Sequence, residues 1–309
     1  MQYIIGLMFT LLLIPSLSVA QQKISLAGEW EIVFESDDAG SHRMLTRKFS
    51  DKINLPLTTD EAKLGDSLNI EPLLNRKVLY QLTRKRRYVG TAWYRRSITI
   101  PDDWKGKRID MLLERVLWQS RVFIDGQQVD GQQESLTTPH LYDLSGLLTP
   151  GTHTILLRIN NDKQYAISYQ NLAHAYTDGT QTIWNGVLGN MGLTANDPVH
   201  IQNIQTYPDL GPKSVKLRIQ FLNNSGKSVA GKLQLTAKLN GKSLPSMSQI
   251  VQIDTGRFVF ETNYDLKPNF QKWDEFSTSI YQLDASLVFD GNKEISQYQT
   301  TFGVRQIIK

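Results

Sequence analysis

The residues best suited to chemistry lie in a polar, glycine-rich loop around a tryptophan, between residues 176 and 193. Carboxylate, amide and aromatic side chains stand close together there: Asp178, Gln181, Trp184 and Asn185. An aromatic face can stack on the apolar side of a sugar ring, while amides and carboxylates hydrogen-bond its hydroxyls. We therefore predict that these four side chains contact carbohydrate. The alternative is that Trp184 packs into a core and the polar groups satisfy a buried turn.

The sequence lacks the residue patterns of several other kinds of catalytic or binding site. The sequence has no Gly-x-Ser-x-Gly nucleophile elbow and no phosphate-binding glycine loop. Its five histidines are scattered, without the spacing that places two metal ligands on one helical turn: His42, His140, His153, His174 and His200. Hairpin turns explain Asp125-Gly126 and Asp130-Gly131 more simply than calcium does. We expect no cofactor, no metal and no catalytic residue.

The strongest charge cluster is the basic run at residues 84–87, followed by Arg95 and Arg96. A nucleic-acid site would interleave such a run with base-stacking aromatics. The whole chain carries 34 basic and 30 acidic residues, so the charges are mixed in sign. We interpret the run as a solvated or domain-facing segment and expect no nucleic-acid partner.

Short, evenly spaced strands fill residues 90–160. Between residues 94 and 100, Tyr94, Ile98 and Ile100 share one face with Arg96, which is the period of a half-buried strand. Asp125-Gly126 after an apolar pair predicts a hairpin turn. No long helical period interrupts these strands, so we predict an all-β antiparallel sandwich.

A second set of strands follows a turn-rich passage at residues 197–212. Apolar and polar residues alternate over 215–221 and again over 233–239, which ends at Asn240-Gly241. A further hairpin turn is predicted at Asp290-Gly291. This spacing is typical of an immunoglobulin-like β-sandwich.

The order of motifs in the first set resembles the N-terminal sugar-binding domain of glycoside hydrolase family 2, which includes β-galactosidases, β-glucuronidases and β-mannosidases. Five pieces carry the resemblance in order: Trp93-Tyr94-Arg95, Ile100-Pro101 with Trp104-Lys105-Gly106-Lys107, Val122-Phe123-Ile124-Asp125-Gly126, Pro139 to Asp143, and Pro150-Gly151-Thr152-His153. The resemblance implies a galactose-binding-like jelly-roll sandwich over residues 21–205. It also implies an immunoglobulin-like sandwich over 206–309.

In this family the corresponding loop reaches toward the active site of an adjoining barrel and can touch the substrate there. Trp184, Gly186 and Leu193 match the family's loop pattern, whereas Asn190 stands where many members have arginine. Residues 302–305, Phe-Gly-Val-Arg, match the motif that closes the second sandwich before the catalytic barrel.

The catalytic parts of the family are not found in the sequence. Glycoside hydrolysis needs two carboxyl groups, which the family places on a barrel of about 250 residues, and the acid/base follows an asparagine. The sequence contains no Asn-Glu dipeptide. The resemblance therefore predicts a non-catalytic part of a glycosidase, inactive alone, with carbohydrate and a barrel on a separate chain as partners. The alternatives are a stand-alone secreted carbohydrate-binding protein and a structural β-sandwich that mediates protein contacts.

The N-terminus predicts export. Residues 4–17 are almost continuously apolar, and Ser18-Val19-Ala20 supplies the small residues that a signal peptidase reads. We interpret residues 1–20 as a signal peptide, with an uncleaved anchor as the alternative. The absence of cysteine excludes lipoprotein attachment and disulfides. The expectation is a secreted or periplasmic bacterial protein without stable membrane insertion after cleavage.

Overall fold

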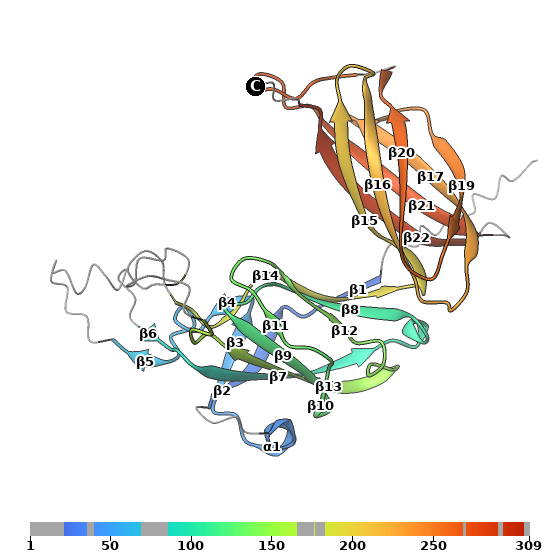
Figure 1. The fold of residues 1–309 in the computed structure, drawn as a ribbon. Coiled ribbons are helices and arrows are strands. Elements are labelled where there is room, and N and C mark those ends of the chain that lie inside the picture. The colour runs from blue at the N-terminus through green and yellow to red at the C-terminus, as the bar shows by residue number, and fades with distance from the viewer. Residues whose placement is uncertain are drawn as a thin grey trace, which may run out of the picture.

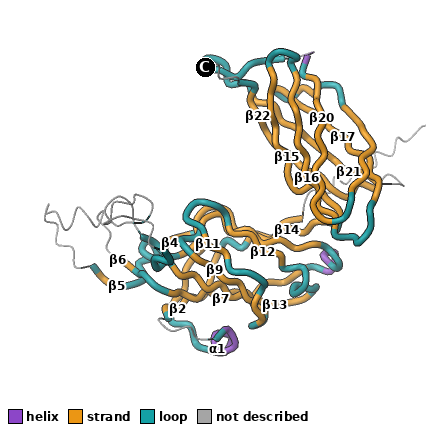
Figure 2. Tube along the Cα trace, viewed as in Figure 1, coloured by secondary structure: helices purple, strands orange, loops and turns teal. Residues whose placement is uncertain are grey.

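The computed structural model describes residues 22–35, 40–68, 86–165, 176, 183–267, 270–289 and 293–305. Figure 1 shows two bodies, each built from layered strands, and Figure 2 shows how little helix they contain. This confirms the all-β prediction of a jelly-roll sandwich followed by an immunoglobulin-like sandwich. In the described ranges, no helix has both the length and the apolar character needed to cross a membrane.

Two sheets face each other in the first sandwich. One has the order β1-β14-β8-β12, with β4 beside β14: β1 Gln22–Ser25, β14 Gly186–Asn196, β8 Arg108–Arg115, β12 His140–Asp143 and β4 Leu57–Thr58. The other has the order β10-β9-β13-β7-β2-β3, with β11 beside β9: β10 Gln127–Gln128, β9 Gln119–Ile124, β13 Gly151–Asn160, β7 Thr91–Ile100, β2 Gly28–Phe34, β3 Asp51–Leu55 and β11 Gln133–Glu134. A two-stranded antiparallel sheet of β5 (Asp66–Ser67) and β6 (Arg86–Arg87) and a 3₁₀ turn (Asp102–Trp104) complete it.

Strand β7 shows why the sequence folds this way. Tyr94, Ile98 and Ile100 are buried in the core between the sheets, while Ser97 and Thr99 are exposed. Burying three such side chains removes a large apolar area from water, worth roughly 1.5–3 kcal/mol each. The alternation predicted for residues 94–100 is confirmed.

A short helix, α1 (Ser41–Thr46), covers the outer face of the β7 sheet (Figure 1). Met44 packs there with Trp93 and Leu156 in a small second core. The Arg95 side chain ends the helix: its Nη1 donates to the carbonyls of Met44, Leu45 and Arg47 at 2.9, 2.9 and 3.0 Å. These carbonyls have no partner within the helix, so a strand residue caps a helix about fifty positions away.

Two of the predicted hairpin turns form, at Asp125-Gly126 and Asn240-Gly241. The prediction of a hairpin turn at Asp130-Gly131 was wrong, because these residues join β10 to β11, which both pair with β9. Asp125 and Gly126 have φ of 50° and 86°, and Asn240 and Gly241 have 50° and 76°. Two consecutive positive φ values make a type I′ turn, whose twist suits a two-residue hairpin. The turn predicted at 290–291 lies outside the described residues.

The second sandwich packs a three-stranded sheet on a five-stranded one. The first has the order β15-β16-β20: β15 Val199–Asp209, β16 Ser214–Asn223 and β20 Gly256–Asp265. The second has the order β18-β17-β21-β22, with β19 beside β17: β18 Lys242–Ser243, β17 Val229–Leu239, β21 Ile280–Phe289, β22 Lys293–Gly303 and β19 Met247–Ile253. Val215, Leu217, Ile219 and Phe221 are all fully buried, as their alternation predicts.

The change from one sandwich to the other comes earlier than the predicted boundary at 205/206. Strand β15 pairs with β16 from Val199↔Asn223 to Asp209↔Ser214, so all of it belongs to the second sandwich. Pro208 suggested a turn, but it lies within β15, at the end of the sheet order, where a missing backbone N–H is tolerated. The junction is therefore the short segment between Asn196 and Val199.

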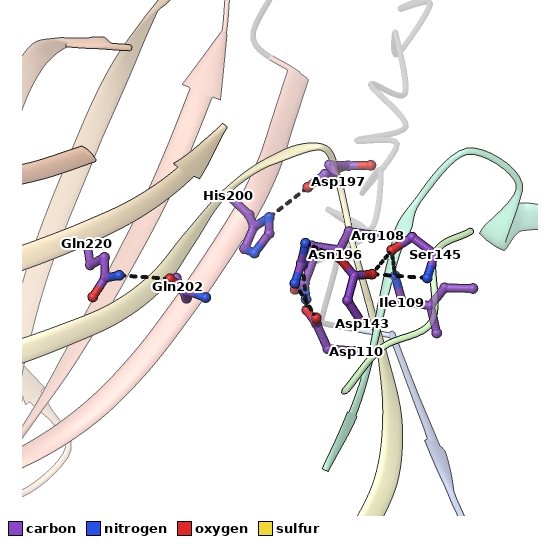
Figure 3. Close-up of polar contacts among 10 residues, drawn as sticks. All are labelled: Arg108, Ile109, Asp110, Asp143, Ser145, Asn196, Asp197, His200, Gln202 and Gln220. Carbon is purple, nitrogen blue, oxygen red and sulfur yellow. Dashed lines mark hydrogen bonds and ion pairs between the residues drawn. The ribbon is translucent and has the colours of Figure 1, made fainter. Parts of the chain in front are cut away.

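A polar network braces this junction on the side of the first sandwich (Figure 3). Arg108 pairs with Asp110 at 2.8 Å and with Asp143 at 2.5 Å, and Asn196 Nδ2 donates to Asp110 at 3.4 Å. Across the junction, His200 is 3% exposed and its Nδ1–H donates to the carbonyl of Asp197 at 2.8 Å. Burial lowers the pKa of His200, although the hydrogen bond to Asp197 and the charge of Asp110 oppose this, so the ring is neutral at pH 7.

Candidate functional site

The predicted loop joins the first sandwich at the end where four strands meet. Strand β13 ends at Asn160 beside the starts of β7 and β9, and β14 begins nearby at Gly186. We call this region the Trp184 end. It holds Trp184 and Asn185, whereas Asp178 and Gln181 lie outside the described residues.

Asn185 is fully buried and ties the loop to the sandwich. Its amide oxygen accepts a hydrogen bond from the Tyr94 hydroxyl at 2.6 Å, and its Nδ2 donates to the carbonyls of Gly90 and Ile159 at 3.2 and 3.4 Å. Its own carbonyl accepts the Thr59 N–H at 2.8 Å. Burial raises the pKa of Tyr94 well above its ordinary value, so this hydroxyl remains a donor. The structure thus gives Asn185 the role of satisfying a buried turn; its contact with sugar stays a prediction.

Gly186, the residue after Asn185, must be glycine for steric reasons. Its φ is 128°, and a Cβ atom there would lie 2.3 Å from the carbonyl oxygen of Leu57. The close backbone approach lets β14 pair with β4 through Gly186↔Thr58. The glycine in the family's Trp-x-Gly pattern therefore has a packing reason at this position.

Trp184 is half-buried and packs on an aromatic cluster at this end. Trp118 forms its centre, with ring centroids 5.1 Å from Tyr176 and 6.1 Å from Tyr165. The Tyr176 hydroxyl donates to the carbonyl of Asn161. Trp118 is 4% exposed, while Tyr165 is 59% exposed. The end therefore presents aromatic faces of fixed orientation.

Beside the aromatic cluster lies a polar group of side chains that sequence reasoning missed, which we call the Glu134 network. Glu134 Oε2 accepts the Tyr165 hydroxyl at 2.6 Å. Its Oε1 accepts Gln119 Nε2 at 2.9 Å and also Gln132 Nε2. Gln119 Nε2 donates in addition to Gln164 Oε1 at 3.1 Å. The bonds from Tyr165 and Gln119 hold the pKa of Glu134 below its ordinary value, so it is a carboxylate at neutral pH.

No linear spacing could have found this network. Its members are 15 and 31 residues apart, and only the β9–β11 pairing Glu134↔Gln119 brings the first two together. The signal available in the sequence was compositional: Gln127, Gln128, Gln132 and Gln133 crowd one short stretch.

A serine and a histidine also meet in the first sandwich, in the arrangement that nucleophilic catalysis uses. Ser120 Oγ lies 2.6 Å from His140 Nδ1 and 2.7 Å from the Tyr142 hydroxyl. Ser120 is fully buried and His140 is 1% exposed, so a substrate has no access. Burial lowers the pKa of His140 to about 4, which leaves it neutral. We assign these residues to the core.

No metal centre is assembled by the described part of the chain, where no three His, Asp or Glu side chains gather suitably.

Asn190, where many family members carry arginine, has a local partner. Its backbone N–H and its Nδ2 both donate to Glu114 Oε2 at 2.7 Å. The pair clamps an irregularity in the β8–β14 pairing between Leu188 and Met191.

With fold and site described, comparison with known proteins becomes informative. Residues 199–305 match the family model described as Glycosyl hydrolases family 2. A β-glucuronidase of Formosa agariphila is 25% identical over 241 residues, covering 70% of this chain and 23% of that protein. A β-galactosidase of Thermoanaerobacter pseudethanolicus is 20% identical over 76% of this chain and 31% of that protein. The chain thus spans a quarter to a third of the length of these relatives.

Solved structures share the fold over nearly the whole chain. A β-glucuronidase from glycoside hydrolase family 2 superposes with a TM-score of 0.73 at 20% identity, covering 93% of this chain and 30% of that one. A putative β-galactosidase from Bacteroides fragilis gives 0.72 at 18% identity, with 93% and 42% covered. Bacteroides uniformis β-glucuronidase 2 gives 0.70 at 20% identity, with 93% and 33% covered.

The fold and the Trp184 end define a two-sandwich β protein. The comparisons confirm the resemblance to family 2 of the glycoside hydrolases, and the chain corresponds to a part of the length of those proteins.

Proposed function

We propose that this chain is the non-catalytic part of a family 2 glycoside hydrolase, which binds carbohydrate and supports a catalytic barrel. The observation that carries the proposal is the Trp184 end, where exposed aromatic faces adjoin a fixed carboxylate and amides. Stacking on a sugar ring and hydrogen bonding to its hydroxyls need these groups together. Family 2 relatives named as β-glucuronidase and β-galactosidase support the substrate class.

The test measures the binding of oligosaccharides to the purified chain, with tryptophan fluorescence as the readout. We expect binding that Trp184→Ala weakens by about five-fold or more, the effect of losing one stacked ring. Tyr207→Ala is the matched control, because Tyr207 is a 50% exposed aromatic on the second sandwich. Equal affinity for both variants would contradict a sugar site at the Trp184 end.

The chain alone should not cleave nitrophenyl glycosides, since the paired glutamates of the family belong to its barrel. Robust hydrolysis that survives repurification would contradict this assignment. An added barrel expressed on a separate chain should restore hydrolysis if the two parts associate.

A specific observation favours a protein partner as well. Phe276 is 93% exposed on the second sandwich, and Ile280 near it is 46% exposed. A contiguous exposed apolar patch marks a protein contact surface, whereas a single exposed apolar side chain does not. We propose that this loop contacts the barrel, so Phe276→Ser should weaken association with a separately expressed barrel while glycan binding is unchanged.

We also propose that the protein is secreted or periplasmic, on the basis of the apolar N-terminus. N-terminal sequencing of the mature protein should begin at Gln21. An intact N-terminus recovered with membranes would indicate the uncleaved anchor instead.

A further inference from the structure

The Glu134 network carries an inference about which sugars the chain takes. Its carboxylate is held from three sides by neutral donors: Tyr165, Gln119 and Gln132. A carboxylate oxygen can accept two hydrogen bonds. Among the described residues, Oε1 receives two and Oε2 receives one, from Tyr165. One acceptor position on Oε2 is therefore open, in a group that is already oriented.

Tyr165 supplies the apolar half of a sugar site. Tyr165 is 59% exposed, its hydroxyl donates to Glu134, and its ring contacts the Trp118 ring. An aromatic ring held in one orientation loses little freedom when a sugar stacks on it. The open carboxylate oxygen lies at the hydroxyl end of this ring, so one ligand can use both groups.

The charges around the network favour a ligand with hydroxyl donors. Two guanidinium groups lie behind it, but they bond its amides: Arg121 Nε donates to Gln132 at 2.6 Å, and Arg158 Nη1 to Gln119 at 3.2 Å. Gln119 Nε2 donates to Glu134 and Gln164, while Gln132 Nε2 and the Tyr165 hydroxyl donate to Glu134. The charge of Arg121 also contributes to the lowered pKa of Glu134. The open position belongs to the Glu134 carboxylate itself, and a second carboxylate placed there would meet a like charge and no hydrogen-bond donor.

We propose that the Glu134 network is a saccharide-binding site for neutral sugars, with Tyr165 as the stacking surface and Glu134 as the acceptor of a sugar hydroxyl. This site discriminates against uronic acids. The inference rests on the proposed carbohydrate-binding function and names its ligand class.

The experiment uses the full chain on an array of neutral and uronic acid oligosaccharides, with affinities of the hits measured by calorimetry. We expect wild-type protein to bind neutral glycans more tightly than uronate glycans of equal length. Glu134→Gln removes a charge-assisted bond and should lower neutral-glycan affinity by about ten-fold while reducing the discrimination. Tyr165→Ala should lower it by about five-fold or more, and Tyr165→Phe by less, because it keeps the ring.

Matched controls are on the second sandwich. Glu261→Gln removes an exposed carboxylate paired with Lys216 at 2.8 Å, and Tyr207→Ala removes an exposed ring; neither should change binding. Circular dichroism at 25 °C verifies that each variant is folded.

The outcomes separate the two proposals. If wild-type protein binds no glycan, the carbohydrate-binding function itself fails, and this inference with it. If Trp184→Ala abolishes binding while the Glu134 and Tyr165 variants bind as wild type, the function stands and the Glu134 network is only structural. Tighter binding of uronates than of neutral glycans would also overturn the inference.

Discussion

Acid should destabilise the first sandwich through a single buried histidine. His140 belongs to a chain of hydrogen bonds with Ser120 and Tyr142. When the neutral His140 ring carries its proton on Nδ1, every donor in this chain has an acceptor. Nδ1–H donates to Ser120 Oγ, the Ser120 hydroxyl to Tyr142, and Tyr142 to the carbonyl of Ser120. In the described structure Nε2 is buried without a partner, so a second proton there would have no acceptor.

The magnitude follows from the two protonation equilibria. Burial lowers the pKa of folded His140 to about 4 from its ordinary value of 6.5, which applies to the unfolded chain. Below pH 6.5 the unfolded chain takes up a proton that the folded chain refuses, so stability is lost as pH falls from 6.5 toward 4. Between pH 7 and pH 5 this amounts to roughly 2 kcal/mol, and about 3 kcal/mol is lost once both states are protonated.

The assay is urea unfolding at pH 7 and pH 5, read by tryptophan fluorescence. Five of the six tryptophans belong to the first sandwich and its loop, so the signal reports mainly that body. His140→Gln is the informative variant, because its amide can still donate to Ser120 but cannot titrate. Its stability should fall by about 2 kcal/mol less than that of wild type between the two pH values.

Comparing the pH dependence of unfolding stability between wild type and His140→Gln cancels the contributions of the other titrating groups. His200 also has a lowered pKa from burial, but it is present in both proteins and its contribution cancels. Equal pH slopes for wild type and His140→Gln would refute the reasoning, whatever the stability of the variant at pH 7.

Three further predictions concern packing. Gly186→Ala places a Cβ atom against the Leu57 carbonyl and should cost the first sandwich at least about 2 kcal/mol, measured by urea unfolding; a neutral result would mean that β4 shifts freely. Arg95→Met removes the cap of α1 and should make the segment around the helix more sensitive to protease, with little change in the melting of the second sandwich; unchanged cleavage would show that packing alone holds α1. Tyr264→Phe removes a hydroxyl that donates to the Pro245 carbonyl and accepts the buried Ala237 N–H, so it should cost the second sandwich about 1–2 kcal/mol by calorimetry; an unchanged stability of the second sandwich would contradict this.

Much of the fold was predictable because its signals are local. The alternation of Tyr94, Ile98 and Ile100 and the Asp125-Gly126 turn depend on residues a few positions apart, and the structure confirms both. The boundary between the sandwiches was placed too late, because Pro208 reads as a turn residue although an edge strand accepts it.

The candidate site was predictable only in part. Residue types could place Trp184 and Asn185 in one loop, but they could not show that Asn185 is buried against Tyr94, 91 residues away. The exposed acceptor at Glu134 was missed altogether, since strand pairing and side-chain contacts assemble its network.

The sequence by itself determined the repeating units of this protein: two sets of alternating strands, their type I′ turns, and family motifs without an Asn-Glu pair. These follow from rules that operate within a strand or a turn, where side chains alternate every second residue and glycine permits positive φ. Only the tertiary structure decided which polar groups are used up inside the fold and which remain open to a ligand. That distinction depends on strand register and burial, because the free energy of a polar group is set by the partner it meets and by its access to water.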